Sequence, residues 1–485
     1  MDELLTGWGR TAATRASVVA VPVAEPTSPG VGDEPTPFEQ AVSEQIRTAG
    51  PRGLIARGLG RSYGDAAQNA GGTVLQLPAA GNGGRALGRT SGCIAQADGI
   101  GPVDSVTGEV SVAAGVSLDA LLRVVVPQGW FVPVTPGTRQ VSVGGALAAD
   151  VHGKNHHHDG SFATSVTRVR LVDGRGDVHR LTPADRAFWA VAGGMGLCGV
   201  VTEVRLRLRP VSSAWMTVRT ERTTDLDATM AALAEADRSQ YSVAWIDCLG
   251  PRSTGGNSST GSCTGGGRGV VTSAEHTAAA DVDGRHRHDP LAFRPTARLA
   301  APPGTPNVLS RPAITAFNEA YFRAAPTRPT IGQHPAASFF HPLDAVRGWN
   351  RLYGRRGFVQ YQLLAPDPET VRAVLAELQR ARAASFLAVL KRFGPGNAGP
   401  LSFPAAGWTL AVDLPAGLDG LPTVLDRLDD RVAADGGRVY LAKDSRLRPE
   451  LLGAMYPQLD RWRELRAGLD PQRVFVSDLS RRLAL

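Results

Sequence analysis

The chain has 485 residues, of which 42% are hydrophobic and 20% are charged. These values are typical of globular proteins, and they exclude collagen-like, coiled-coil and wholly disordered chains. The formal net charge of +7 favours acidic partners only weakly. Because the charge is dispersed and no nucleic-acid-reading module is present, we expect no nucleic-acid partner.

The N-terminus carries acids where a signal peptide carries a basic patch, and no run of about 18 apolar residues occurs. We therefore expect no signal peptide and no transmembrane helix, and a protein that is cytoplasmic or peripheral to the inner membrane. The four cysteines, Cys93, Cys198, Cys248 and Cys263, form no C-x-x-C pair. This spacing predicts neither a disulfide framework nor a zinc site.

The first part of the chain alternates strands with glycine-rich turns. An apolar strand, LIAR, precedes the loop GLGRSYGD, and another strand is expected at 109–115. A helix over 117–126 follows, with Ser117 as its N-cap. After it come turns with a short helix that begins at a Gly-Gly pair, two strands, and a helix near 183–191. Strand alternation then stops at Pro210.

From about 215 to 437 the pattern changes to units of strand, helix and strand, which predicts a second, α+β domain. Inside it, the Gly/Ser-rich segment from about 251 to 310 lacks periodicity, and we expect a mobile loop there. The resulting boundaries are a first domain over 1–212, a second over 213–437, and a C-terminal segment over 438–485.

Three glycines, Gly58, Gly60 and Gly64, crowd the loop after the strand LIAR. Closely spaced glycines let backbone N–H groups approach a pyrophosphate. The loop is not a Rossmann fingerprint, because Gly64 comes one position late and a turn follows where a helix should begin. A tight structural turn is the alternative interpretation.

A second group of tight turns lies between Pro136 and Asn155. There His152 and Lys154 alternate on an extended segment, so their side chains should point the same way. A salt-bridged surface turn is the alternative. The run 156–158 is three histidines, but consecutive side chains diverge and no Glu or Cys completes a ligand set, so we expect no metal.

Only three of the 52 basic residues are lysines: Lys154, Lys391 and Lys443. Each is informative, because arginine cannot replace lysine as a group that deprotonates. Gln360 and Gln362 share a face of one strand and offer amide groups to sugar hydroxyls. Lys391 and Lys443 would add positive charge for a phosphate or a developing oxyanion. Together these residues favour an anionic, polyhydroxylated ligand over solvated strand faces.

Longer motifs carry a resemblance to a known family. They are GLGRSYGDAAQNAGG, PGTRQVSVGGALAADVHGKNHH, FNEAYFRAAP, FFHPLDAVRGWNRLYG, GFVQYQ, KRFGP with LSFP, and YLAKDSR. In this order they resemble the decaprenylphosphoryl-β-D-ribose 2′-oxidases, a family of FAD proteins of the vanillyl-alcohol-oxidase type. The similarity runs from LLTGWGR to SDLSRRL, with the Gly/Ser-rich segment as the main exception.

The resemblance implies an α+β fold with a PCMH-type FAD-binding domain, an α+β substrate domain built on an antiparallel sheet, and a C-terminal segment that returns to the FAD domain. It implies that the pyrophosphate and adenosine side of FAD is held by Arg57, Gly58, Leu59, Gly60, Arg61, Ser62, Tyr63, Pro136, Gly137 and Thr138. The residues implied around the flavin are Val143, Gly144, Gly145, His152, Gly153, Asn155, Gly199, Val201 and Tyr440. Relatives that bond FAD covalently have a histidine where this chain has Arg61, so non-covalent FAD is expected.

The implied reaction moves a hydride from C2 of the ribose of a polyprenyl-phosphoryl ribose to flavin N5, which gives a 2-keto sugar. A separate NADH-dependent reductase would complete the epimerisation to arabinose. A nearby group must take the hydroxyl proton, and Lys443 is the first candidate and His152 the second. The implied substrate residues are Trp245, Phe340, Gln360, Gln362, Lys391, Thr409 and Ala411.

This chain departs from the family pattern at three of those positions. Thr409 and Ala411 stand where Asn and Cys are common, and Phe340 stands where Tyr is common. Sugar oxidation is therefore a firmer expectation than the identity of the sugar. One alternative is oxidation of another sugar, an aldonolactone, an alditol or a nucleoside sugar. A catalytically silent flavin-binding or polyprenyl-phosphate-binding component is another, and the retention of Lys443 and His152 argues against it.

Overall fold

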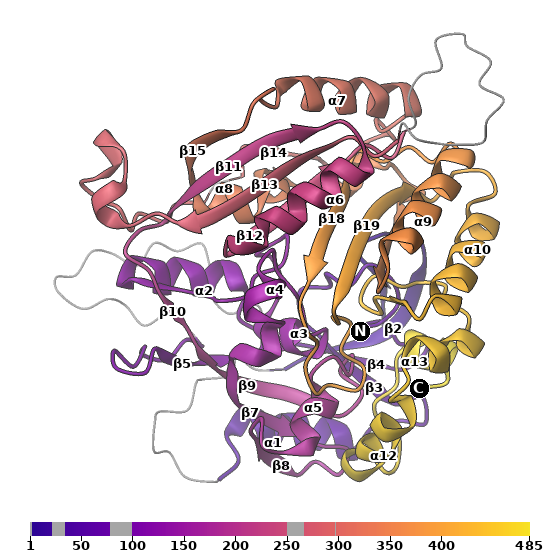
Figure 1. Ribbon diagram of the computed structural model, residues 1–485. Coiled ribbons are helices and arrows are strands. Elements are labelled where there is room, and N and C mark those ends of the chain that lie inside the picture. The colour runs from indigo at the N-terminus through magenta and orange to yellow at the C-terminus, as the bar shows by residue number, and fades with distance from the viewer. Residues whose placement is uncertain (1, 22–33, 78–98, 250–265, 296) are drawn as a thin grey trace.

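Figure 1 shows the computed structural model, which describes residues 2–21, 34–77, 99–249, 266–295 and 297–485. In these residues the strands form one eight-stranded sheet, two four-stranded sheets and two short two-stranded pairs. The short pairs are β6 (Trp130–Phe131) with β10 (Arg209–Pro210), and β14 (Leu299–Ala300) with β16 (Val346–Arg347).

The first part of the chain builds both four-stranded sheets. One has the order β1-β2-β4-β3 and the other the order β5-β9-β7-β8, which is antiparallel throughout. The strands of the first sheet are β1 (Asp2–Thr6), β2 (Ala13–Ala20), β3 (Leu54–Arg57) and β4 (Thr73–Gln76). Those of the second sheet are β5 (Glu109–Ala113), β7 (Val166–Val172), β8 (Val178–Leu181) and β9 (Val200–Arg207).

Five α-helices accompany these sheets in the described residues: α1 (Pro37–Arg47), α2 (Leu118–Val125), α3 (Val143–Ala148), α4 (His156–Asp159) and α5 (Arg186–Val191). Helix α2 confirms the helix expected at this place, because the Ala120 N–H donates to Ser117 Oγ at 3.0 Å. Helix α1 begins with a capping box between Thr36 and Glu39. The same Glu39 carboxylate accepts from Arg170 Nε of β7 at 2.7 Å. This buried ion pair joins α1 to the second sheet.

The eight-stranded sheet has the order β15-β11-β13-β12-β18-β19-β17-β20, and all its pairs are antiparallel. The expected antiparallel sheet of the α+β second domain is therefore confirmed. Its strands are β11 (Trp215–Thr223), β12 (Tyr241–Ile246), β13 (Gly269–His276), β15 (Thr330–Pro335), β17 (Phe358–Ala365), β18 (Ala388–Phe393), β19 (Gly407–Pro415) and β20 (Arg438–Val439).

Three helices, α6 (Leu226–Glu235), α9 (Pro368–Arg380) and α10 (Leu421–Ala434), cover one face of this sheet (Figure 1). The Tyr361 hydroxyl of β17 donates to the Asp429 carboxylate of α10 at 3.0 Å on that face. Side chains alternate along a strand, so Gln360 and Gln362 point to the opposite face. That opposite face forms one wall of the cavity described below.

The prediction of a mobile loop over 251–310 is wrong for the part of this segment that the structure describes. Residues 250–265 lie outside the described residues. Strand β13 occupies Gly269–His276 and pairs with both β11 and β12. The Gly/Ser-rich composition hides this strand, because the segment GVVTSAEH is stabilised by its two neighbours and not by a local pattern of its own. Strand β14, at Leu299–Ala300, also falls in the segment.

The C-terminal segment packs against the first part of the chain. It contains α11 (Leu452–Met455), α12 (Leu459–Leu469) and α13 (Asp478–Leu483). Phe475 bridges Leu54 of β3 in parallel, Trp462 Nε1 donates to the Ala190 carbonyl at 3.0 Å, and Arg482 pairs with Asp65 at 2.8 Å. The exact domain boundaries at 212 and 437 stay a prediction.

None of the helices in the described residues is long and apolar enough to cross a membrane. Of the cysteines, Cys198 and Cys248 are buried free thiols, and Cys93 and Cys263 lie outside the described residues.

Candidate active site

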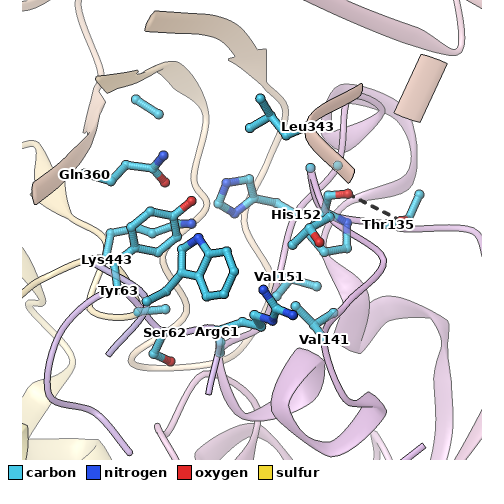
Figure 2. A pocket seen from close by; sticks show the side chains of 18 of the residues that line it. Arg61, Ser62, Tyr63, Thr135, Val141, Val151, His152, Leu343, Gln360 and Lys443 are labelled. Atoms are coloured by element: carbon cyan, nitrogen blue, oxygen red, sulfur yellow. Dashed lines mark hydrogen bonds between the residues drawn. The ribbon is translucent and has the colours of Figure 1, made fainter. Parts of the chain in front are cut away.

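One large cavity lies between the inner face of the eight-stranded sheet and the loops of the first part of the chain (Figure 2). Its volume of about 630 Å³ is typical of cavities that bind small molecules and cofactors. Most residues singled out by the sequence line it. They are Gly58, Leu59, Gly60, Arg61, Ser62, Tyr63, Pro136, Gly137, Thr138, Gly144, Gly145, His152, Gly153, Gly199, Val201, Trp245, Phe340, Gln360, Gln362, Lys391, Ala411, Tyr440 and Lys443.

The glycine-rich loop after β3 is held against the C-terminal segment that carries Lys443. The Tyr63 N–H donates to the Ala442 carbonyl at 2.9 Å. A Cβ atom on Gly64 would lie 1.9 Å from the Asp444 carbonyl oxygen, and neither backbone can yield that much space. Gly64 is therefore required by the contact between two backbones, and for this glycine the structural interpretation holds.

The same loop packs on the start of helix α3. A Cβ atom on Gly58 would lie 2.1 Å from Ser142 Oγ, and Ser142 caps α3 by accepting from the Gly145 N–H at 3.3 Å. Gly60 has a φ of +61°, a conformation that favours glycine. The close packing brings both segments to the same wall of the cavity.

Arg61 brings an incompletely paired positive charge to this wall. Its guanidinium lies 3.9 Å from the centroid of the Trp8 ring, and Arg61 Nε is buried without a hydrogen-bond partner in the described part of the chain. Burial lowers the pKa of Arg61, and the carboxylate of Asp344 opposes this effect. A buried donor without a partner is unusual in a native protein and indicates a site for an acceptor.

The inner face of the eight-stranded sheet forms the opposite wall. Gln362 of β17 lies opposite Ala411 of β19, and Thr409 of β19 lies opposite Lys391 of β18. Residues opposite each other on neighbouring strands share a face of the sheet. Trp245 of β12 lines the cavity on the same face. The sheet register therefore gathers residues that are 166 positions apart in the sequence, from 245 to 411.

All three lysines of the chain line this cavity. Burial lowers the pKa of Lys443 and of Lys154 to about 7, and the charge of Lys391 adds to both effects. Burial lowers the pKa of Lys391 itself to about 8. None of the three forms a salt bridge within the described residues. The cavity therefore holds three lysine amines, and a bound anion would stabilise their protonated forms.

His152 is a neutral imidazole in this cavity. Gln362 Nε2 donates to His152 Nε2 at 2.8 Å, and because an amide nitrogen only donates, the ring proton resides on Nδ1. His152 Nδ1 is buried and has no partner among the described residues. Burial and the nearby lysines hold the pKa of His152 well below its usual range. The alternative of a salt-bridged surface turn is wrong, because His152 and Lys154 are both buried against the cavity.

A buried acid, Asp413 of β19, stands next to the lysine at the C-terminal wall. Gln360 Nε2 donates to Asp413 Oδ1 at 2.5 Å, and Lys443 Nζ lies 3.6 Å from the centroid of the Tyr63 ring. Figure 2 shows Gln360, Tyr63 and Lys443 together on one side of the cavity. Burial raises the pKa of Asp413 to about 7 and Lys443 opposes that rise, so the two groups titrate as a pair near neutral pH.

Comparison with known proteins identifies the family. A profile of the FAD binding domain matches residues 39–182, and one of D-arabinono-1,4-lactone oxidase matches residues 425–483. The decaprenylphosphoryl-β-D-ribose oxidase of Mycolicibacterium smegmatis is 40% identical over 99% of this chain and 97% of its own length. The chain belongs to the decaprenylphosphoryl-β-D-ribose oxidase family.

Two further relatives match different shares of this chain. An uncharacterized protein of Streptomyces coelicolor is 42% identical over 76% of this chain and 100% of its own length. Cytokinin dehydrogenase 4 of Oryza sativa is 29% identical over 34% of this chain and 30% of its own length. The second match is confined to about a third of each chain, so it does not bear on the substrate.

As a member of the decaprenylphosphoryl-β-D-ribose oxidase family with an FAD binding domain, the protein is an FAD-dependent oxidoreductase. The expected fold class and cofactor are confirmed. The cavity fits such a cofactor, because it offers unpaired buried donors at Arg61 Nε and His152 Nδ1. Nothing lies within 4 Å of an added Cβ atom at Gly137, so the backbone there is open to a ligand.

Four residues expected to contact FAD or substrate do not line the cavity of this oxidase family member. Arg57 donates to two backbone carbonyls, and the Val143 side chain is fully buried in the core. The Asn155 amide donates to the Pro133 carbonyl at 2.8 Å. Thr409 Oγ1 accepts from Gln362 Nε2 at 3.2 Å. Three of these four residues form hydrogen bonds with segments at or next to the cavity: Arg57, Asn155 and Thr409.

Other residues reach the site although the sequence assigned them no contact with FAD or substrate. Trp8 and Ser142 line the cavity, and Lys154 donates to the Phe339 carbonyl and lies 3.9 Å from the centroid of its ring. Lys154 shares the signal that marked the other lysines. Asp413 had a usable signal as the single acid of the strand GWTLAVDLP.

The three consecutive histidines of this oxidase family member contact different partners. The ring of His156 packs 4.3 Å from Phe393, whereas His157 Nε2 and His158 Nε2 bond to the carbonyls of Ser239 and Asp237. In the described residues no group of three metal-ligating side chains is present. The diverging orientations follow from the one-residue spacing on α4.

Proposed function

We propose that the protein oxidises the C2 hydroxyl of the ribose in decaprenylphosphoryl-β-D-ribose, or in a close polyprenyl-phosphate sugar, to the 2-keto sugar. The observation that carries this proposal is the convergence of all three lysines on one cavity with Gln360 and Gln362. Lysine side chains without a salt bridge suit a phosphate, and primary amides suit sugar hydroxyls. The name of the M. smegmatis relative supports the same substrate.

Bound FAD supplies the acceptor for the hydride that leaves C2. The chain must then take the proton of the C2 hydroxyl, and we assign this role to Lys443. A pKa of about 7 leaves about half of its amines neutral at pH 7, so they can accept a proton. His152 is the weaker candidate, because its Nε2 lone pair already accepts from Gln362 and its pKa lies well below 6.5.

The remaining roles divide between orientation and charge. Gln360 and Gln362 would hold the sugar, and each is itself fixed, by Asp413 and by Thr409 respectively. Lys391 would hold the phosphate. Tyr440 contributes its ring, because its hydroxyl donates to the Ala149 carbonyl at 2.7 Å.

The glycine-rich loop and the α3 start are assigned to FAD. Arg61 stands where covalent relatives have a histidine, and guanidinium nitrogen does not form that bond, so FAD is held without a covalent link. The unpaired Arg61 Nε would donate to an acceptor of the cofactor. Release of yellow flavin into the supernatant on acid precipitation tests the non-covalent link.

The product requires a second enzyme, and we propose a separate NADH-dependent keto-sugar reductase as the partner. Together the two steps would epimerise ribose to the arabinose donor of cell-wall arabinan. A polyprenyl-phosphate substrate resides in a lipid phase, so we also propose a peripheral membrane contact.

A second candidate is the oxidation of another sugar, an aldonolactone or a nucleoside sugar. Phe340 and Ala411 support this second candidate, because both line the cavity and neither has a polar side chain that could bind a sugar hydroxyl. The lactone oxidase profile carries little weight for substrate choice. Of the residues 425–483 that it matches, only Tyr440, Ala442 and Lys443 line the cavity.

Anaerobic titration of the purified yellow protein separates the candidates. Stoichiometric bleaching of the flavin absorbance by a polyprenyl-phosphoryl ribose, but not by free ribose or arabinono-1,4-lactone, would support the proposal. Bleaching by the lactone alone would assign the protein to the second candidate. Bleaching by none of these compounds would remove both.

A further inference from the structure

Helix α7 (Arg311–Ala324) carries most of its apolar residues on the outside, and Ile314 is the apolar residue that it buries. Its buried face contains Asn318, whose amide donates to Asp247 at 2.8 Å and to the Ser385 carbonyl at 3.0 Å. Surface helices of soluble proteins show the opposite arrangement, with polar residues facing water. The exposed positions at helical spacing are Ala313, Ala316, Phe317, Ala320, Tyr321 and Ala324.

Exposed apolar side chains from neighbouring segments extend this surface. Leu299 is 68% exposed, Val308 46% and Ile331 74%, alongside Phe317 at 47% and Tyr321 at 43%. These five are among the seven large hydrophobic side chains that are exposed in the described residues. Figure 1 shows α7, β14 and β15 at the same end of the molecule. We call this surface, made by the five residues and the exposed alanines of α7, the apolar face.

The cavity opens at the apolar face. Tyr321 belongs to both, because it is exposed, lines the cavity and places its ring 4.9 Å from that of Trp245. The ring of Phe317 stacks on Tyr321 with centroids 6.0 Å apart. His334 of β15 is likewise exposed and lines the cavity. A long apolar ligand could therefore extend from the apolar face through the cavity to the lysines.

The apolar face is flanked by positive charge. Between residues 297 and 331 the chain has four arginines and one acid, a difference of +3. The acid, Glu319, is paired with Arg268 at 2.7 Å and with Arg323 at 2.6 Å. Apolar side chains bordered by arginines are the pattern of segments that bind anionic lipid surfaces.

We propose that the apolar face docks on an anionic lipid bilayer, with α7 lying in the plane of the interface and the cavity mouth turned to the acyl chains. This inference rests on the proposed function in one respect: the docking would let a polyprenyl-phosphate enter the cavity from the membrane. The binding itself requires no turnover. A second copy of the chain and a protein partner are the competing occupants of the face.

Sedimentation of the FAD-loaded full chain with sucrose-filled vesicles tests the docking. Vesicles of phosphatidylglycerol and phosphatidylcholine should bind it at least tenfold more tightly than vesicles of phosphatidylcholine alone, and the difference should shrink in high salt. Phe317→Ser and Ile331→Ser should each weaken binding about tenfold. Val106→Ser, at a residue 91% exposed on a different part of the fold, is the matched control and should change nothing.

The charge is tested separately. Arg328→Glu should weaken binding to the anionic vesicles about tenfold or more, whereas Arg382→Glu, at an exposed arginine after α9, should not. Light scattering of the free protein should show the same mass for the parent chain and for Phe317→Ser. A dimer that Phe317→Ser dissociates would overturn the proposal in favour of a second copy, and equal binding by all variants would overturn it as well.

Flavin bleaching by a water-soluble, short-chain phosphoryl ribose separates this inference from the proposed function. The Phe317 and Ile331 variants should oxidise the soluble compound at the parent rate and lose the rate only with vesicle-borne substrate. If the parent chain binds anionic vesicles but oxidises neither compound, the docking stands and the proposed substrate is wrong. If it oxidises the soluble compound but binds no vesicles, the docking is wrong and the proposed function stands.

Discussion

Replacing Lys443 by arginine separates charge from proton transfer at the proposed reacting centre. Arginine keeps a positive charge beside the Tyr63 ring, but it does not deprotonate in a protein. If Lys443 accepts the hydroxyl proton, Lys443→Arg should bind FAD normally and lose about 10²-fold or more in the rate of flavin reduction by substrate. Lys443→Ala should lose a comparable amount.

The structure sets the pH dependence of the same rate. With a pKa of about 7, Lys443 is neutral in about a tenth of molecules at pH 6, about half at pH 7 and about nine tenths at pH 8. A lysine with its ordinary pKa would be neutral in only about 0.04% of molecules at pH 7. Anaerobic stopped-flow reduction should therefore rise about tenfold from pH 6 to pH 8, with an apparent pKa that belongs to the Lys443–Asp413 pair.

Lys154 is the matched control, because burial lowers its pKa to the same value while its ammonium donates to the Phe339 carbonyl. Lys154→Arg should keep the rise in rate between pH 6 and pH 8, and Lys443→Arg should abolish it. A near-parent rate in Lys443→Arg, or a parent rate that is flat across this range, would refute the assignment of Lys443 as the proton acceptor.

Three other substitutions test the surroundings of the site. Gly64→Ala should lower the Tm and the FAD content together, because its Cβ would lie 1.9 Å from the Asp444 carbonyl oxygen; thermal melts and the ratio of flavin to protein absorbance measure both. Lys154→Met should raise the Tm most below about pH 7, because there the folded chain must bury a charged amine. The gain in Tm should shrink as the pH rises toward 10.5, and thermal melts at several pH values would measure it. Thr409→Val should raise KM severalfold with a smaller change in kcat, because Gln362 loses one of its two partners, and steady-state kinetics would reveal a purely structural role if only stability changed.

The elements that were predictable from the sequence are those with local signals. Helix α2 follows from the Ser117 cap and from apolar residues at helical spacing, and both signals lie within ten residues. Strand β13 was missed because its flanks are Gly/Ser-rich and its stability comes from pairing with β11 and β12. Information about such partners is spread along the chain and does not show in a window of eight residues.

The same distinction applies to the site. Gln360 and Gln362 could be placed on one face from strand alternation alone, and both line the cavity. The direction of the Asn155 side chain could not be inferred, because it depends on a carbonyl at Pro133 supplied by another turn. Asp413 gains its importance only from the register that sets it opposite Gln360.

Two of the three departures from the family pattern, Thr409 and Ala411, lie on the inner face of the eight-stranded sheet, beside the residues proposed to hold the sugar and the phosphate. Ala411 faces Gln362 across the sheet, and Thr409 faces Lys391. Thr409 still holds the Gln362 amide through its hydroxyl, so loss of the larger amide side chain leaves that donor oriented. Ala411 leaves space beside Gln362 where a Cys side chain would stand. We expect such changes to affect the choice of sugar more than the chemistry. Lys443 and Tyr63 belong to other segments, and the hydrogen bond from the Tyr63 N–H to the Ala442 carbonyl joins those two segments to each other.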